Sequence, residues 1–157
     1  MFNFAKPVRV TWTALHCLIF PIVLHPPASA QNDFQPATAA NAKQFVGVWK
    51  ATFQGRPFMT IALTTQNDKL VGTMSHVDIE VNKEGELTKA EAGEGEDPIA
   101  DLRVKGNILR ITIKTTDGDS IQSGLTLTAA DEAALQMLVP ADVPTPKPWK
   151  LKRVSTK

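Results

Sequence analysis

The sequence predicts an all-β protein: an up-and-down antiparallel meander of about eight or nine strands that closes into a small barrel. Three observations predict it. Apolar and polar residues alternate in short segments, which is typical of strands with one buried face. Turn residues recur at spacings of roughly 10 to 12 residues. No long segment repeats the i, i+3, i+4 apolar pattern of a helix. So many strands in one small domain curl into a barrel, or form a two-layer β-sandwich as the alternative.

The first 30 residues have the order of a secretory signal. A basic start is followed by an apolar run from Val10 to Leu24, and Ala28-Ser29-Ala30 then supplies the small residues of a cleavage site. The apolar run has about 15 residues, fewer than the roughly 20 of a spanning helix, which disfavours the alternative of a retained membrane anchor. We therefore expect Gln31 to be the first residue of the mature protein.

Export and composition limit the classes of function. We expect a signal peptide over residues 1–30, a flexible lead-in over 31–44 and a single barrel domain over 45–157, in a bacterial protein that is periplasmic or secreted and not stably inserted in the membrane. Cys17, the only cysteine, falls in the signal, so the mature chain has no disulfide and depends on its core. Its Lys and Arg residues nearly balance its Asp and Glu residues, which gives no electrostatic argument for nucleic acid as a partner.

The strands themselves are defined by period-2 alternation. In the first, Trp49 shares one face with Ala51 and Phe53, and we take this face as the core face. Turn residues separate the strands, among them Asn67-Asp68 and Asp117-Gly118, which are typical of two-residue hairpins. The expected strands are 45–53, 59–64, 70–81, 86–90, 99–104, 107–114, 120–127, 134–139 and 149–154.

Two charged segments have alternative interpretations. Glu91 to Pro98 is expected to be an acidic, glycine-bearing loop. Its carboxylates are ligands that calcium accepts, but they lack the regular spacing of a calcium loop, so a solvated turn is the simpler reading. The last strand, Trp149 to Val154, is rich in lysine. We expect an edge strand that its lysines keep soluble, with contact to anionic lipid or cell-wall polymer as the alternative.

Phe45-Val46-Gly47-Val48-Trp49 has the form F-x-G-x-W. In this it resembles the opening of the first strand in lipocalins and fatty-acid-binding proteins. The resemblance implies a calycin-type barrel in which Gly47 lets the strand bend, Trp49 fills the closed end and Arg153 packs against Trp49. The chain departs from both families after this strand. Only residues 54–57 lead to the next strand, where lipocalins have a long loop and fatty-acid-binding proteins have two helices.

The sequence shows no catalytic or metal-binding constellation. His76 is the only histidine after residue 30, and no G-x-S-x-G motif accompanies it. We interpret His76 as a partly exposed histidine at a strand end. With one histidine and no cysteine in this part of the chain, a zinc site would need carboxylates for nearly all its ligands. We therefore expect no metal, no cofactor and no enzymatic activity.

The function that these features favour is binding of a small apolar ligand inside an exported barrel. The alternative is a ligand-free structural or interaction module of the bacterial cell envelope. The expected ligand-lining residues are apolar and face inward in the predicted strands, although each also suits a plain core: Met59, Ile61, Leu63, Met74, Leu109, Ile111 and Leu125.

Overall fold

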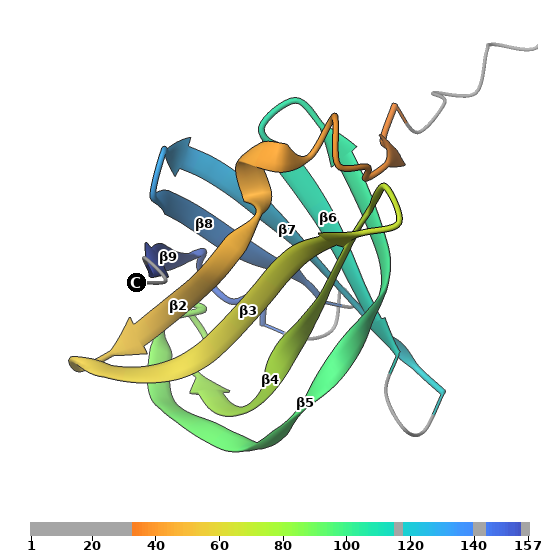
Figure 1. Cartoon of the computed structure of the whole chain (residues 1–157). Helices are drawn as coiled ribbons and strands as arrows, with labels where there is room; N and C mark the ends of the chain where they lie inside the picture. The colour runs from red at the N-terminus through yellow and green to blue at the C-terminus, as the bar shows by residue number, and fades with distance from the viewer. Residues whose placement is uncertain (1–32, 115–117, 140–143, 155–157) are drawn as a thin grey trace, which may run out of the picture. The chain divides into compact units, whose positions relative to one another are not determined.

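A computed structural model of the chain describes residues 33–114, 118–139 and 144–154. These residues form an all-β antiparallel barrel (Figure 1), which confirms the predicted fold class. The predicted signal peptide, its cleavage site and Cys17 lie outside the described residues. The strands are β1 (Gln35–Pro36), β2 (Gly47–Phe53), β3 (Arg56–Gln66), β4 (Lys69–Val81), β5 (Leu87–Lys105), β6 (Ile108–Lys114), β7 (Ser120–Ala129), β8 (Glu132–Leu138) and β9 (Trp149–Val154).

Eight of the nine strands, β2 to β9, make the closed wall. Each consecutive pair from β2 to β9 is antiparallel, and β9 pairs back onto β2, so that the meander has no free edge in the ring. The hairpin turns follow the predicted chemistry. Asn67 and Asp68 both have positive φ, as a two-residue turn between right-twisted strands requires. The predicted turn at Asp117-Gly118 lies partly outside the described residues.

The closure of the ring corrects the expectation for the last strand. β9 pairs with β2 through Trp49↔Arg153 and with β8 through Ala133↔Leu151. It is therefore an interior strand and not an edge strand. Its lysines cannot serve to protect an open edge, because hydrogen-bonding partners occupy both of its sides.

The N-terminal stretch completes the wall where β4 and β5 diverge. The prediction placed the first element of the domain at Phe45, but β1 already pairs with the end of β5. Ala37 follows β1, and its N–H donates to the Leu102 carbonyl while its own carbonyl accepts from the Leu70 N–H. Ala37 is buried. A short 3-10 helix, η1 (Lys43–Phe45), then leads the chain into β2 (Figure 1).

A long hairpin made of β4 and β5 extends past the ring (Figure 1). The expected loop from Glu91 to Pro98 is part of β5, paired with β4 through contacts such as Asp78↔Glu91 and Thr73↔Pro98. The sequence-based interpretation as a loop was wrong. This part of β5 is largely exposed, so its residues need no apolar alternation to form a strand.

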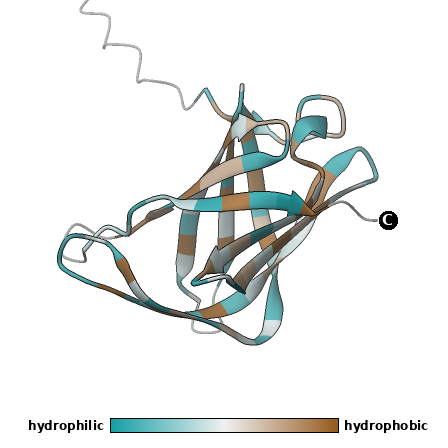
Figure 2. Cartoon of the chain, turned by 90° about the vertical axis from the view of Figure 1, so that its left-hand side faces the viewer, coloured by the Kyte–Doolittle hydropathy of each residue, from teal (hydrophilic) through white to brown (hydrophobic). Residues whose placement is uncertain are grey.

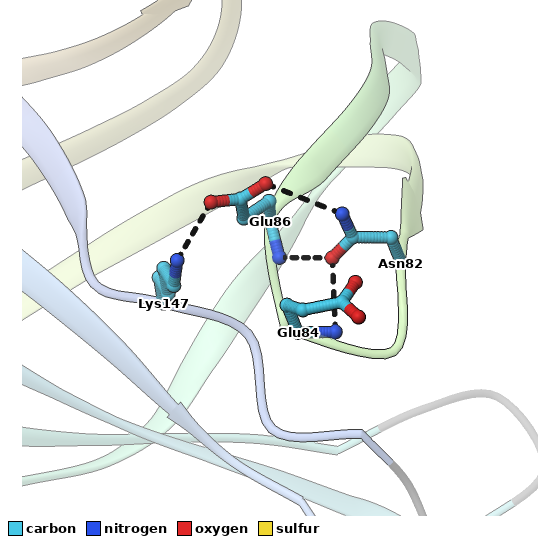
Figure 3. A network of polar contacts seen from close by, with 4 residues as sticks. All are labelled: Asn82, Glu84, Glu86 and Lys147. Carbon is cyan, nitrogen blue, oxygen red and sulfur yellow. Dashed lines mark hydrogen bonds and ion pairs between the residues drawn. The ribbon is translucent and has the colours of Figure 1, made fainter.

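The tip of this hairpin bonds to the segment that precedes β9 (Figure 3). Asn82 folds the tip by accepting the backbone N–H of Glu84 and of Glu86 on its side-chain oxygen. Lys147 then donates its ammonium to the Glu86 carboxylate at 2.7 Å and its backbone N–H to the Gly85 carbonyl at 2.8 Å. The hairpin is thus fastened at its far end as well as at the barrel.

Apolar and polar residues alternate along the strands (Figure 2), and the inward residues form one buried cluster. At the closed end, where β2 begins, Trp49 is fully buried and its indole N–H donates to the Phe45 carbonyl at 2.8 Å. Arg153 lies over the Trp49 ring at 4.4 Å, where the lipocalin resemblance places it. Gly47 has φ +134, and a Cβ there would meet the Arg153 side chain at 3.3 Å. Glycine therefore lets the arginine cross this strand.

Candidate functional site

A pocket of about 220 Å³ lies at the end of the barrel opposite Trp49, which we call the open end. Residues from six strands line it. Its interior is mainly apolar. His76, Asp97 and Ile121 are among its partly or largely exposed residues, and we take them to mark its mouth. The lining residues are Met59, Met74, Ser75, His76, Val77, Asp97, Ile113, Ile121, Ser123, Leu135 and Met137.

Ser123 explains why the barrel is hollow here. Toward the closed end, inward residues such as Leu109, Ile111 and Leu125 are large and fully buried, and they fill the interior. On β7 the inward series alternates Ser123 with Leu125, and Ser123 is 2% exposed. The serine side chain is shorter and narrower than that of the leucine two positions along, and the neighbouring side chains do not close the space.

The Ser123 hydroxyl is also a free polar group. Within the described residues its side chain makes no hydrogen bond, although it is the one polar residue in the buried class. The hydroxyl is not among the side-chain atoms that are fully enclosed without a partner, so it opens onto the space of the pocket. This hydroxyl lines the pocket, so a bound molecule with one polar atom can satisfy it.

His76 stands at the mouth, in an interruption of the β4–β5 ladder. The register passes from Ser75↔Glu96 to Val77↔Ala92, so three residues of β5 lie opposite His76. Two of them are Gly93 and Gly95, where a Cβ would approach the histidine to 2.9 Å and 3.4 Å. A larger residue would crowd the Cβ and backbone of His76 at position 93 and its imidazole at position 95. The histidine is therefore within a strand at a bulge, and not at a strand end as expected.

Both nitrogens of the His76 ring are held by acceptors. Nε2 lies 3.0 Å from the Asp97 carboxylate, and Nδ1 lies 2.7 Å from the Glu94 carbonyl oxygen. Since both partners only accept hydrogen bonds, the doubly protonated imidazolium satisfies them together. The hydrogen bond to Asp97, followed by the bond to Glu94, raises the pKa of His76 above its ordinary value. A ring held in this way is a poor general base, because neither nitrogen presents a lone pair.

The structure separates the seven expected ligand-lining residues into two groups. Met59 and Met74 line the pocket. The other five lie in the buried core cluster and outside the pocket: Ile61, Leu63, Leu109, Ile111 and Leu125. Sequence reasoning missed the contribution of Ser123, whose signal is a small polar residue at an inward position of an alternating strand. Sequence reasoning also missed that His76 and Asp97 lie together at the mouth of the pocket. Their positions depend on the bulge in the β4–β5 pairing, and a bulge leaves no pattern in a single sequence.

The acidic residues of β5 do not gather into a metal site in the part of the chain that the structure describes. No group of three or more His, Cys, Asp and Glu side chains is placed to hold an ion there. Lys89 instead lies 3.0 Å from the Asp78 carboxylate and 3.4 Å from that of Glu91. Residues 33–114, 118–139 and 144–154 also contain no helix of the length and apolarity needed to cross a membrane.

Together the fold and the pocket define a class: a closed eight-stranded antiparallel barrel, compatible with the calycin-like barrels, with an apolar pocket at one end. Comparison of the chain with protein-family models, with curated proteins and with solved structures finds no match.

Proposed function

We propose that this protein is an exported, non-catalytic, lipocalin-like barrel that binds a small, mainly apolar molecule in its open-end pocket. The single observation that carries the proposal is the pocket itself, whose inner lining is apolar apart from one buried hydroxyl. Three methionines, Met59, Met74 and Met137, contribute to the lining. Their unbranched side chains adapt to the shape of a ligand at low cost.

The volume limits the size of the ligand. A cavity of 150 Å³ in another protein holds benzene, so a pocket of about 220 Å³ suits a molecule of about ten non-hydrogen atoms. At about 0.5 kcal/mol per atom such a ligand binds with a Kd on the order of 0.1 mM. Titrations should therefore reach millimolar ligand.

The mainly apolar lining with the Ser123 hydroxyl suits a ligand that carries one polar atom. The Ser123 hydroxyl can donate a hydrogen bond to that atom or accept one from it, and in a mainly apolar pocket such a bond is stronger than in water. Phenol and benzene form a matched pair of probes, because they differ by a single hydroxyl and both fit the volume. We expect phenol to bind about fivefold to tenfold more tightly than benzene, the value of one net hydrogen bond.

Two substitutions at Ser123 test the proposal by NMR titration. Ser123→Ala keeps the space and removes the hydroxyl, so the preference for phenol should disappear while benzene still binds. Ser123→Leu fills the space, so both probes should lose binding while the fold remains. Val48→Leu, on the outer face of β2, is the matched control and should bind both probes as the wild type does. Equal binding of both probes to wild type and Ser123→Leu would contradict the proposal.

The alternative function, a ligand-free structural or interaction module of the cell envelope, is favoured by the filled closed end of the barrel. Native mass spectrometry of protein purified without detergent separates the two. A bound small mass supports the ligand-binding barrel, and a bare mass together with no binding of phenol supports the alternative.

Export is the remaining part of the proposal, and it rests on the signal-like order of residues 1–30. N-terminal sequencing of protein from the exporting host tests it. A mature chain that begins at Gln31 is expected, and one that begins at Met1 or at a lipidated Cys17 would contradict export by cleavage.

A further inference from the structure

A second hollow lies on the outer side of the barrel, over β2, β3 and β9 and beside the start of β5. It is a groove of about 610 Å³, separate from the open-end pocket. We call it the lysine groove. Its lining combines five apolar residues with three lysines and one threonine: Lys50, Thr52, Pro57, Phe58, Leu87, Trp149, Lys150, Lys152 and Val154.

The three lysines, Lys50, Lys150 and Lys152, are concentrated without counter-charges. Lys50 lies directly opposite Lys152 across the β2–β9 ladder, and Lys150 is the diagonal neighbour of Lys50. Like charges in this relationship destabilise a sheet. None of the three forms an ion pair or side-chain hydrogen bond within the described residues. Glu132 lies opposite Lys152 on β8, but the two side chains do not pair. Because β9 is an interior strand, protection of a sheet edge does not account for them.

The floor of the groove is apolar and contains an unpartnered donor. Phe58 and Trp149 are buried and meet edge to face, with ring centroids 5.5 Å apart. Trp149 is 8% exposed, and its indole N–H is buried without an acceptor in the described part of the chain. That N–H is enclosed by protein atoms, so a molecule in the groove does not reach it. The groove thus offers three ammonium groups beside an apolar surface.

We propose that the lysine groove binds a single amphiphilic anion: a molecule with a phosphate or carboxylate head and a short apolar chain. The ammonium groups neutralise the head and donate to its oxygens, and Leu87, Phe58 and Val154 contact the chain. Charge and apolar burial both favour this class, and no neutral or cationic molecule satisfies the three lysines.

Octyl phosphate below its micelle concentration is the probe, and NMR of the indole N–H groups is the readout. We expect binding that weakens as salt is raised, together with a change in the chemical shift of the Trp149 indole, whose ring lines the groove. Octyl glucoside has the same chain with a neutral head, and inorganic phosphate has the head without the chain. Each should bind at least about tenfold more weakly than octyl phosphate.

The variants locate the site. Lys50→Gln combined with Lys150→Gln and Lys152→Gln should weaken octyl phosphate binding about tenfold. The matched control removes three exposed lysines elsewhere, by Lys43→Gln, Lys69→Gln and Lys114→Gln, and should leave binding unchanged. Trp149→Phe keeps the apolar floor and deletes only a buried N–H that the ligand does not reach, so it should leave binding unchanged.

Several outcomes would overturn the proposal. The proposal fails if the wild type and the triple lysine-to-glutamine variant bind octyl phosphate equally well. It also fails if octyl glucoside or inorganic phosphate binds the wild type as tightly as octyl phosphate does. Attachment to phosphatidylglycerol vesicles without binding of free octyl phosphate would assign the lysines to a membrane surface instead. The Ser123→Leu variant keeps the groove intact, so failure of the pocket and failure of the groove are distinguishable.

Discussion

The guanidinium of Arg153 stacks on the fully buried ring of Trp49 and at the same time binds the backbone at three places. Nη1 donates to the Val46 carbonyl at 2.8 Å, and Nη2 donates to the carbonyls of Gln44 at 2.6 Å and Ala130 at 2.8 Å. Nε lies 3.4 Å from the Asp131 carboxylate without hydrogen-bond geometry. One side chain therefore joins the entry to β2 with the turn before β8.

This arrangement predicts that lysine cannot replace arginine at position 153. A lysine ammonium lacks the planar fork that reaches separate carbonyls while it stacks on a ring. Arg153→Lys should lower the free energy of unfolding by about 2–3 kcal/mol. Arg56→Lys, at an exposed arginine, is the control and should change it by less than about 0.5 kcal/mol. Urea melts compare the two, and equal midpoints would refute the bracing role of Arg153.

The two described tryptophans should respond differently to the same substitution. The Trp49 indole N–H is bonded to the Phe45 carbonyl, whereas the Trp149 indole N–H has no acceptor. Trp49→Phe loses that bond and leaves a cavity, at a cost of about 2–3 kcal/mol. Trp149→Phe removes an unsatisfied donor and should cost less than about 1 kcal/mol. Chemical denaturation decides, and a larger loss for Trp149→Phe would show that the closed end is not organised around Trp49.

The docked hairpin tip depends on Gly85. This residue has φ +76, and a Cβ there would clash with the Thr145 carbonyl oxygen. Gly85→Ala should therefore undock the tip, and amide hydrogen exchange at residues 82–86 should rise at least about tenfold. Lys147→Gln removes only an exposed ion pair and should change exchange little. If Gly85→Ala exchanges like the wild type, the tip is not held by this contact.

His76 should titrate at a higher pH than an ordinary histidine. Its bonds to the Asp97 carboxylate and the Glu94 carbonyl favour the protonated ring, so its pKa lies above 6.5. The stabilisation is then complete below pH 6.5 and is lost as the pH rises through the raised pKa. NMR titration of the His76 ring measures this pKa directly. Asp97→Asn should lower it, and a value at or below 6.5 in the wild type would mean that the two contacts do not form in solution.

The barrel could be predicted because its wall repeats one local rule. Alternation buries one face of each strand, and short turns make successive strands antiparallel neighbours. The rule fails where a strand leaves the core. Glu91 to Pro98 has no apolar alternation because both of its faces are largely exposed, so its charges and glycines suggested a loop. The pairing of β1 also gave no signal, since two residues are too few for a pattern.

The candidate site could be predicted only in part, for a related reason. Large inward residues such as Ile61 and Leu109 are easily identified, but large residues fill space, and they form the core. A pocket arises where an inward residue is small, as at Ser123, and where neighbouring strands do not close over it. The His76 rim depends on the register shift between Ser75 and Val77, and one sequence does not reveal a shift that is set by the pairing of two strands.

The barrel is filled at its closed end and hollow at its open end. A crystal structure determined under xenon pressure can locate the hollow, because xenon enters apolar cavities without needing a specific partner. We predict a xenon atom between Met59, Ser123 and Leu135 in the wild type, and none there in Ser123→Leu. Side chains packed across that space, with no xenon at the open end of the wild type, would contradict the account.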